Sequence, residues 1–457
     1  MKIAFLRKKK LSEVRILALG FLIIILLGGV ILSLPISSKN GTYTSLVDSI
    51  FTATSAVCVT GLITVDTGTH WNTFGHSVIM VLIELGGLGF MSITTFIAIL
   101  LGKKITLRDR LIMQEAMNAL DIQGLVKMMK YIVILTFSVQ SIGAFLLSFI
   151  FIPQFGIGKG IFYSIFHSIS AFCNAGFDLF GNFRSLTGYY NNYYLIIIIS
   201  MLIVIGGLGF SVLSDLLNFK HIRKFSIHTK LVLYVTASLI ALGALLIFCV
   251  EYKNEATLGS LNFGEKVLNS VFASITPRTA GFNSISTGDM TMSGKLVTII
   301  LMFIGGSPGS TAGGLKTTTF AVLILTVVSV LNGRDDTEVF GRRFSKESVY
   351  KAFALFVLVM AIVLGVTMIL SVAEPEQQFI DLLYEASSAI GTVGITTGVT
   401  QQIGTLSKFV IMLAMYFGRL GPITVFLALM KKNKKALHAI AVIASVMSVL
   451  MYVSYIP

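Results

Sequence analysis

The chain has 457 residues, of which 55% are hydrophobic and only 12% are charged, and its formal net charge is +14. Soluble domains carry about 25% charged residues, so this composition excludes an ordinary soluble enzyme and predicts a protein whose solvent is mostly lipid. The excess of basic residues would suit nucleic acid or an anionic surface, and its distribution along the chain decides between these interpretations.

A basic segment, 1–15, precedes an apolar run at 16–34. A membrane-spanning helix needs about 20 apolar residues, whereas the apolar core of a signal peptide has about 7 to 15. No small-residue cleavage pattern precedes the turn "LPISS". We therefore interpret 1–15 as a cytosolic N-terminus and 16–34 as a retained transmembrane helix.

Long and short apolar runs then alternate along the chain in the order long, short, long, four times. The remaining long runs cover 74–101, 131–152, 193–217, 231–250, 296–330, 352–372 and 409–430, and the short runs cover 46–57, 161–172, 266–275 and 379–390. Short apolar runs of about 10 to 14 residues are typical of re-entrant segments. This order predicts an all-α membrane protein.

Its four pseudo-repeats each consist of a helix, a re-entrant pore helix, a filter loop and a second helix, arranged around a central pore. We place the repeats at 16–104, 127–218, 229–331 (with a broken second helix) and 349–430. A basic linker and an apolar C-terminal segment follow at 431–457.

The basic residues fit this topology. With the N-terminus inside, 25 of the 35 lysines and arginines fall on inner segments and 7 on outer ones. Such an excess on cytoplasmic loops orients membrane proteins, so we predict a multi-pass protein with a cytoplasmic N-terminus and no nucleic-acid partner. Three basic residues fall at membrane depth, namely Arg278, Lys316 and Arg419.

Each short run ends in a related peptide that contains a glycine. The peptides are "VCVTGL" at Gly61, "FCNAGF" at Gly176, "PRTAGF" at Gly281 and "GTVGIT" at Gly394, and the glycines are 115, 105 and 113 residues apart. A second glycine motif follows in each repeat: "GGLGF" from Gly86 and Gly206, "GGSPG" from Gly305 and "GRLGP" from Gly418. Eight motifs in one register predict four equivalent structural units.

Four glycine peptides at membrane depth can form a ring of backbone carbonyls that replaces the hydration shell of an ion. The C-terminal end of each short helix carries partial negative charge and favours a cation. The predicted filter set is Val59, Thr60, Gly61, Asn174, Ala175, Gly176, Thr279, Ala280, Gly281, Thr392, Val393 and Gly394. Only the glycine is common to all four peptides, so we expect a less symmetric filter with looser selectivity. The alternative is the glycine-rich bundle of a secondary transporter, which usually has two repeats.

These motifs, together with "GGSPGSTAGGLKT" from Gly305 to Thr317, resemble the Trk/Ktr/HKT superfamily of potassium transporters, most closely its KtrB-type pore subunits. The resemblance implies potassium uptake through a gated, channel-like pore in a bacterial plasma membrane, with potassium at the filter. A serine in place of the first filter glycine is associated with sodium transport in plant relatives, so Gly61 points to potassium.

The resemblance further implies a homodimer in the lipid bilayer, a cytosolic nucleotide-binding regulatory ring of the KtrA type, and sodium as a possible activator. The chain has no cluster of catalytic side chains, and we expect neither an enzyme nor a cofactor. An ion-coupled secondary transporter, linked to protons or sodium, is the second functional class. It would move a second ion in fixed stoichiometry.

A gate is predicted inside the filter. The third repeat's second helix contains the small-residue stretch Gly305, Gly306, Ser307, Pro308, Gly309, Ser310, Thr311, Ala312, Gly313 and Gly314, followed by Lys316. Proline and glycine oppose helix here, so we interpret the stretch as a flexible loop across the pore, with simple close packing as the alternative. Arg419 replaces a motif glycine, and the resemblance implies an electrostatic barrier; the alternative is a pair with a buried acid.

Several other polar residues receive structural interpretations. We expect Arg278 to brace the filter against an acid such as Glu385, Glu84 to pair with a basic neighbour, and Asp48 and Asp381 to stabilise the N-termini of short helices. The inner segments 103–110 and 333–351 are either docking surfaces for a cytosolic partner or basic loops at the lipid surface. The apolar stretch 436–457 departs from the family pattern, where a short tail would be expected.

Overall fold

The computed structural model describes residues 13–89, 125–217, 225–334 and 336–421. Four long helices in this part begin the four repeats: α1 (Glu13–Ser33), α7 (Leu125–Phe155), α12 (Ile227–Glu251) and α16 (Lys346–Ala373). Within the described ranges they are the four helices whose length and hydropathy suit a membrane span, or five spans if one bent pair is counted. Apolar side chains on their outer faces are exposed, as in Ile23 and Leu27 of α1, which is the pattern of a helix in lipid.

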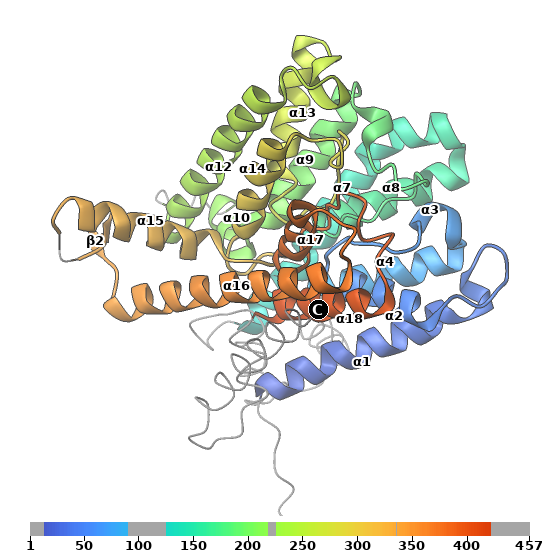
Figure 1. Cartoon of the computed structure of the whole chain (residues 1–457), viewed down its shortest axis with the longest axis horizontal. Coiled ribbons are helices and arrows are strands. Elements are labelled where there is room, and N and C mark those ends of the chain that lie inside the picture. Colours follow the sequence, from blue (N-terminus) through green and yellow to red (C-terminus); the bar gives the residue numbers. More distant parts are fainter. Residues whose placement is uncertain (1–12, 90–124, 218–224, 335, 422–457) are drawn as a thin grey trace, which may run out of the picture.

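Each long helix packs against the short helix that follows it in sequence. The short helices are α2 (Leu46–Val57), α8 (Ile157–Phe172), α13 (Phe263–Ile275) and α17 (Phe379–Gly391). Their positions confirm the predicted short runs. Their C-terminal halves are almost entirely buried, and α17 lies near the middle of the molecule in Figure 1. The short helices therefore deliver their C-terminal ends to the centre of the fold.

The second helix of each repeat is short or broken. The first and fourth repeats have α4 (Thr73–Gly87) and α18 (Thr405–Leu420). The second repeat has α9 (Tyr193–Leu208) and α10 (Phe210–Leu217), and the third has α14 (Met292–Phe303) and α15 (Thr317–Leu331). The predicted continuous span at 193–217 is wrong, because α9 and α10 meet at an angle of 103°.

Gly209 produces this bend. Its φ angle is +91°, which lies in the left-handed region that glycine tolerates and other residues disfavour. A Cβ atom at this position would lie 2.6 Å from the carbonyl oxygen of Pro308. The helix therefore breaks where the glycine-rich stretch of the third repeat lies against it, a contact that periodicity within one repeat could not reveal.

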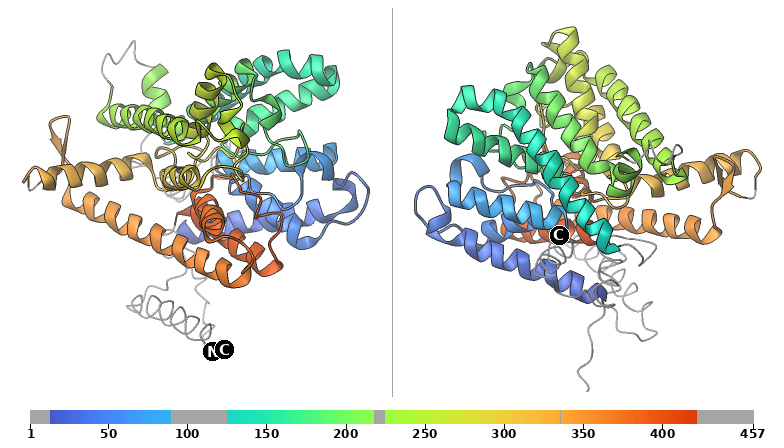
Figure 2. Two further views of the ribbon diagram at one scale, coloured as in Figure 1. Left: turned by 45° about the horizontal axis from the view of Figure 1, so that its top comes forward. Right: turned by 180° about the vertical axis from the view of Figure 1, so that it is seen from behind.

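The smaller elements connect these helices. Among the described residues they are two 3-10 turns, η1 (Pro35–Ser37) and η2 (Thr187–Tyr189), the short helix α3 (Thr67–His70), a π-helical turn η3 (Glu255–Gly259), and an antiparallel ribbon of β1 (Glu338–Val339) and β2 (Arg342–Arg343). The ribbon joins α15 to α16, and these two helices pack against each other and extend away from the rest of the described chain (Figures 1 and 2).

The first-repeat helices and those of the fourth repeat are in contact, since α18 packs against α2. Contacts also join α4 to α8, α9 to α13 and α14 to α17. The four repeats therefore close into a ring in chain order. The predicted inner segment 103–110, the linker at 431–435 and the apolar stretch 436–457 lie outside the described residues, and the predicted repeat boundaries stay predictions.

Candidate ion-conduction site

The four predicted filter peptides share one backbone conformation. The residue two positions before each glycine has a positive φ angle: 55° at Val59, 59° at Asn174, 68° at Thr279 and 51° at Thr392. The glycines follow with 97° at Gly61, 71° at Gly176, 79° at Gly281 and 91° at Gly394, while the residue between has no positive φ. The differences among the side chains therefore do not extend to the backbone. Positive φ is unfavourable for valine and threonine and is found where the surroundings enforce it, often at functional sites.

Hydroxyl groups of the short helices hold these peptides in place. The Ser55 hydroxyl accepts a hydrogen bond from the Gly61 amide, and the Ser388 hydroxyl accepts one from the Gly394 amide, both at 3.0 Å. Ser170, six residues before Gly176, instead donates to the carbonyl oxygen of Phe177 at 2.7 Å. In the third repeat Thr276 donates to the carbonyl oxygen of Phe282. In each repeat a hydroxyl group in the short helix, or directly after it, thus bonds the predicted filter peptide or the residue that follows it.

The four glycines meet at the centre. A Cβ atom on Gly61 would lie 2.5 Å from the carbonyl oxygen of Ala175, and one on Gly176 would lie 2.5 Å from the Cα atom of Gly281. A Cβ on Gly281 would approach the carbonyl oxygen of Val393 to 3.0 Å, and one on Gly394 would lie 2.9 Å from the Cα of Gly61. The contacts run from each repeat to the next and close the circle, so the predicted filter residues come together from all four repeats.

The second glycine motif packs against the ends of the short helices beside the predicted filter peptides. Gly86, Gly206 and Gly418 each lie so close to their own repeat's pore helix that a Cβ atom would collide with its last carbonyl oxygens, at Val57, Phe172 and Ile390 respectively. Small residues allow helices in membranes to approach in this way. In the third repeat, Gly305 instead faces the carbonyl oxygen of Gly313. The motif therefore brings the second helix against the filter in three repeats and closes a loop in the other.

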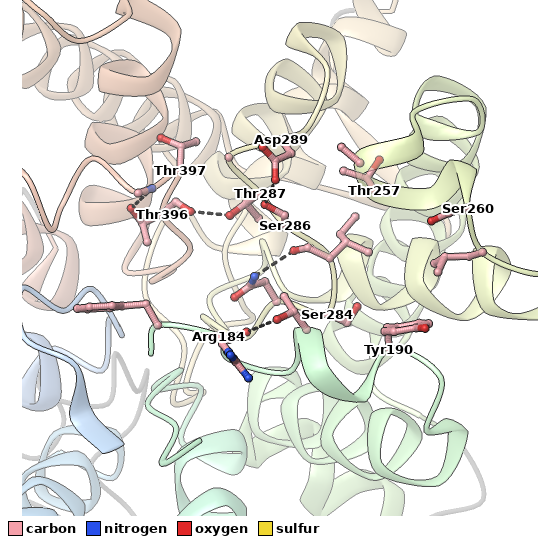
Figure 3. A pocket seen from close by; sticks show the side chains of 18 of the residues that line it. Arg184, Tyr190, Thr257, Ser260, Ser284, Ser286, Thr287, Asp289, Thr396 and Thr397 are labelled. Atoms are coloured by element: carbon pink, nitrogen blue, oxygen red, sulfur yellow. Dashed lines mark hydrogen bonds between the residues drawn. The ribbon is translucent and has the colours of Figure 1, made fainter. Parts of the chain in front are cut away.

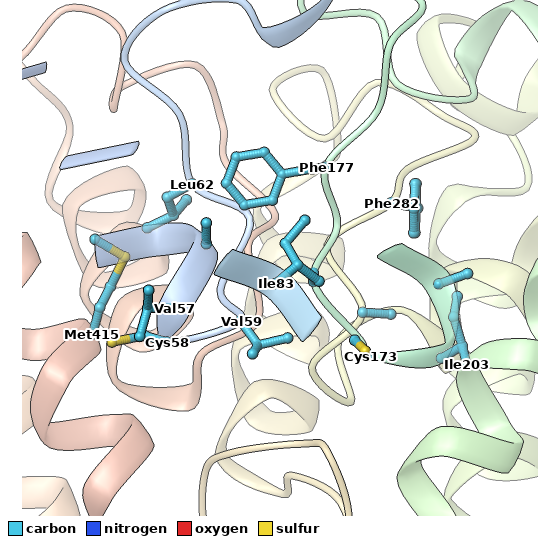
Figure 4. Close-up of a cluster of buried hydrophobic side chains, with 14 of the residues drawn as sticks. Val57, Cys58, Val59, Leu62, Ile83, Cys173, Phe177, Ile203, Phe282 and Met415 are labelled. Atoms are coloured by element: carbon cyan, nitrogen blue, oxygen red, sulfur yellow. The ribbon is translucent and has the colours of Figure 1, made fainter. Parts of the chain in front are cut away.

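Apolar side chains surround the filter peptides (Figure 4). The residue after each glycine is buried: Leu62, Phe177, Phe282 and Ile395 are at most 2% exposed. Cys58 and Cys173, three residues before their glycines, are fully buried free thiols. Apolar side chains thus enclose the four predicted filter peptides.

A cavity of about 890 Å³ lies beside the segments that follow the third and fourth filter peptides (Figure 3). Asn283 and Thr396, each two residues after a filter glycine, contribute to its lining. The Thr287 hydroxyl joins the two segments by donating to the carbonyl oxygen of Thr396 at 2.5 Å. The lining is rich in hydroxyl and amide groups, which suits a hydrated space next to the filter.

The predicted gate stretch forms a closed loop between α14 and α15. At its base, the Gly305 amide donates to the carbonyl oxygen of Leu315 at 2.8 Å, and the Thr317 amide donates to that of Gly306 at 3.1 Å. The loop then crosses to the second repeat, where the Ser307 amide donates to the carbonyl oxygen of Gly207 at 2.9 Å. Gly309 and Thr311 make further backbone hydrogen bonds with the second repeat.

Thr311 ties the loop to the base of the second filter peptide. Its hydroxyl lies 3.2 Å from the carbonyl oxygen of Phe172 and 3.1 Å from the Oδ1 atom of Asn174. On the other side, Gly314 comes close to the fourth repeat, since its Cβ would lie 3.2 Å from the carbonyl oxygen of Gly391. The loop therefore contacts the N-terminal ends of two predicted filter peptides that lie across the ring from each other.

Arg419, in the fourth repeat, connects this loop to the first repeat. Its guanidinium group donates to the carbonyl oxygens of Thr311, Gly86 and Gly87, the last at 3.1 Å. Its hydrogen-bond partners in the described chain are thus carbonyl oxygens, and the alternative of a buried acid as its partner is not seen there. Lys316 donates to the carbonyl oxygen of Ala312 at 2.7 Å and so folds back over the loop.

The predicted pairing of Arg278 with Glu385 is wrong, and the predicted basic partner of Glu84 is not seen among the described residues. Arg278 donates to the Thr236 hydroxyl on α12 at 3.3 Å, whereas the Glu385 carboxylate accepts hydrogen bonds from Thr396, Thr397 and Thr400 and has no need of a cation. Glu84 accepts from the Gln140 amide at 2.9 Å and from the Cys173 thiol at 3.4 Å, and the described chain shows no basic partner for it. Neutral donors bond both oxygens of Glu385 and the Oε2 atom of Glu84, whereas the Oε1 atom of Glu84 is buried without a hydrogen-bond partner in the described chain.

Sequence reasoning missed two ion pairs between repeats. Lys408 on α18 contacts Asp48 on α2, and Lys295 on α14 contacts Asp381 on α17, both at 2.7 Å. Each lysine is the fourth residue of its second helix, and each aspartate is the third residue of the next short helix. Comparing the repeats position by position would have shown these matching charges, whereas helix capping alone explained the aspartates.

Comparison with known proteins places this geometry in a family. The sequence model of TrkH, described as cation transport protein, matches residues 21–438. The potassium/sodium uptake protein NtpJ of Enterococcus hirae is 44% identical over 94% of this chain and 95% of its own length. The Ktr system potassium uptake protein B of Bacillus subtilis is 42% identical over 90% of this chain and 91% of its own length.

A solved structure agrees with the fold. The crystal structure of the potassium transporter TrkH from Vibrio parahaemolyticus superimposes with a TM-score of 0.72 at 17% identity, covering 94% of this chain and 87% of that one. The likeness in fold, the matching sequence model and the relatives above agree with the four-repeat architecture. The chain belongs to the TrkH family of cation transport proteins.

Proposed function

We propose that this chain forms a gated pore through which potassium enters a bacterial cell down its electrochemical gradient. The observation that carries the proposal is the single backbone conformation, left-handed at both ends of a three-residue peptide, that recurs in four peptides around one centre. Alternating conformations of this kind turn successive carbonyl oxygens toward one axis, where they replace the water around a cation. The names of the relatives from E. hirae and B. subtilis support potassium as the ion.

In this proposal the ion binds to backbone oxygens only. It contacts, in turn, the carbonyl groups of the twelve filter residues given above, from Val59 to Gly394. The partly negative C-terminal ends of α2, α8, α13 and α17 point toward the same place and favour a cation. Side chains hold the peptides but do not touch the ion.

The proposed route begins in the hydrated cavity beside the filter and ends below it, where the loop from Gly305 to Lys316 lies across the path. Two positive groups, on Arg419 and Lys316, sit at this loop. We assign the loop as the gate and Arg419 as both a clamp and a positive barrier to cations. A gate at this point must move because the loop contacts the bases of the second and fourth filter peptides.

The finer features of the assembly are part of the same proposal. The Ktr system to which two B. subtilis relatives are assigned by name has several components, which supports a homodimer that works with a cytosolic nucleotide-binding ring. The name of the E. hirae relative includes sodium, which supports sodium as an activator. The N-terminus is cytoplasmic, and the chain conducts ions without a cofactor or enzymatic chemistry.

Growth on limiting potassium tests the proposal. An uptake-deficient bacterium that expresses this chain should grow at potassium concentrations where the empty strain does not. Gly61→Ser should reduce the preference for potassium over sodium, because a side chain at this left-handed position collides with Ala175 in the next repeat. Gly158→Ala, which has open space around it, is the matched control. No growth from the parent chain, or an unchanged ion preference in the serine variant, would contradict the proposal.

The same strain separates the pore from an ion-coupled transporter. A pore moves potassium alone, and its accumulation follows the membrane potential. A coupled transporter moves protons or sodium with potassium in a fixed ratio. Simultaneous measurement of potassium and proton or sodium fluxes should therefore show no fixed ratio.

A further inference from the structure

One position in the pore helices differs in chemistry from repeat to repeat. Nine residues before the filter glycine, the four repeats carry Thr52, His167, Phe272 and Glu385. All four side chains are fully buried. The two titratable residues stand in the second and fourth repeats, which lie across the ring from each other.

His167 contacts the backbone that follows its own filter peptide. Its Nδ1 atom lies 2.7 Å from the carbonyl oxygen of Tyr163, which can only accept, so Nδ1 carries the proton. Its Nε2 atom is then free to accept, and the Leu179 amide donates to it at 3.3 Å. The ring also stacks on Phe180, with centroids 4.5 Å apart. The imidazole is thus fixed in one tautomer and one orientation.

Glu385 likewise contacts the backbone that follows its own filter peptide, in the fourth repeat, but through a carboxylate instead of an imidazole. Its Oε1 atom accepts hydrogen bonds from the Thr397 amide at 3.0 Å and from the Thr396 hydroxyl. Its Oε2 atom accepts from the Thr400 hydroxyl at 2.6 Å. Both oxygens therefore hold the segment that leads away from the filter, with no basic side chain among these partners.

The two contacts are equivalent by position. Leu179 and Thr397 are each the third residue after the filter glycine, and each donates its backbone amide to the residue nine positions before that glycine. The first and third repeats lack this contact. The Thr52 hydroxyl donates to the carbonyl oxygen of Asp48 within its own helix, at 2.8 Å, and Phe272 has no acceptor.

We propose that His167 and Glu385 are positioning residues that hold the outer ends of the second and fourth filter peptides, so that discrimination between potassium and sodium is set along one diagonal of the ring. The proposal rests on the proposed function of the four peptides as a filter. A buried amide that loses its acceptor must find another partner, and the peptide that carries it shifts. Because the carbonyl oxygens before it are part of the same short peptide, their spacing changes as well.

Ion selectivity of reconstituted protein tests this inference. His167→Phe keeps the ring and its stacking, and Glu385→Met keeps the length of the side chain, but neither can accept the amide. We expect the potassium preference over sodium in liposome flux to fall at least about tenfold in each, equivalent to about 1.4 kcal/mol, the size of one lost hydrogen bond. His167→Gln and Glu385→Gln retain an acceptor oxygen and should retain most of the preference.

Thr52→Val and Phe272→Leu are the matched controls, because they change the same register position in the repeats that lack the contact. Wild-type selectivity in folded His167→Phe and Glu385→Met protein would overturn the inference. Glutamine variants that lose selectivity as fully as the apolar variants would do so too, because the acceptor would then not be the decisive feature.

Amide hydrogen exchange of the unaltered protein provides a test that needs no variant to fold and no transport. The segments 177–180 and 395–400 should exchange more slowly than the equivalent segments 62–65 and 282–287. Equal or faster exchange in the second and fourth repeats would overturn the positioning role of His167 and Glu385 even if the chain conducts potassium. If the chain shows this protection but does not conduct potassium, the positioning role stands and the proposed function is contradicted instead.

Discussion

Arg419 occupies the position at which the first three repeats have glycine, the second residue of the second glycine motif. Its guanidinium group joins the proposed gate loop at Thr311 to the end of α4 at Gly86 and Gly87. A positive charge at membrane depth is costly, by about 2.5 to 3.5 kcal/mol on insertion scales, and implies a specific role. The side chain can act in two ways, by fixing the loop and by repelling a passing cation.

Removing the side chain should raise potassium flux. Two like charges about 8 Å apart repel by about 2 kcal/mol at an effective dielectric constant of about 20, which corresponds to about thirtyfold in rate. We therefore expect Arg419→Ala to increase flux into liposomes by about ten- to thirtyfold. Arg419→Lys keeps the charge but loses the forked contacts, and it should show a smaller increase. Unchanged or lower flux in folded Arg419→Ala protein would contradict the assigned role.

Asp178 lies in the loop after the second predicted filter peptide. Burial, together with the negative Asp66, raises its pKa from 3.8 to about 7, against the effect of a hydrogen bond from the Phe180 amide. The folded protein therefore binds this proton more tightly than the unfolded chain does. The stabilisation is fully present below pH 3.8 and is lost as the pH rises through about 7.

Thermal unfolding in detergent between pH 5 and pH 8 measures this effect. The unaltered protein should lose stability across this range, and Asp178→Asn, which cannot titrate, should lose less. The stability of each protein is compared with its own value at pH 5, so a general change in stability caused by the substitution does not affect the result. Parallel pH profiles for the two proteins would show that Asp178 does not titrate in this range.

The bend between α9 and α10 is the element that connects the gate loop to the second repeat. The Phe210 amide donates to the carbonyl oxygen of Gly309 at 2.9 Å, directly after the left-handed Gly209. The bend therefore forms a seat for the loop. Any side chain at position 209 would be strained and would also collide with Pro308.

We expect Gly209→Ala to destabilise the protein by about 1 kcal/mol or more, because alanine disfavours positive φ. It should also release the gate loop and increase potassium leak into liposomes. Gly188→Ala has nothing within 4 Å of the added Cβ atom and is the control. A variant with normal thermal stability and normal leak would show that the loop does not depend on this seat.

The long and short elements could be predicted from the sequence because hydropathy and run length report them directly. Leu46–Val57 and Phe379–Gly391 follow the predicted short runs to within a residue. The break at Gly209 could not be predicted, since the run around it is largely apolar on both sides and the partner that requires the break, Pro308, belongs to another repeat. Local pattern gives the elements, but contacts between repeats decide where a helix must bend.

The candidate site, too, could be predicted from the sequence only in part. The four glycines were predictable because they recur at nearly equal spacing, and the shared left-handed angles at Val59 and Thr392 follow from that register. The partners of Arg278, Glu84 and Glu385 were not predictable. A buried charged residue suggests an oppositely charged partner, yet the donors that bond Glu84 and Glu385 in the described chain are hydroxyl, amide and thiol groups. Such neutral donors carry no pattern in sequence.

The orientation of the whole molecule rests on the distribution of lysine and arginine and is open to a direct test. Lys39 and Arg342 are both exposed and lie at opposite ends of the proposed topology. Cys249 is the exposed native thiol among the three cysteines, so Cys249→Ser provides a suitable background. In this background, Lys39→Cys should react with a membrane-impermeant thiol reagent on intact cells. Arg342→Cys should react only after the cells are opened, and the reverse pattern would show that the N-terminus lies outside.

The central claim is that four backbone peptides jointly bind a cation, and the most direct measurement locates that cation. Rubidium substitutes for potassium and scatters X-rays anomalously, so crystals of the purified protein grown in rubidium should reveal its position. We predict anomalous density on the axis between the carbonyl oxygens of Thr60, Ala175, Ala280 and Val393, lost on replacement of rubidium by sodium. Ordered rubidium elsewhere, for example beside Glu84, with none between these four carbonyl groups, would contradict the account.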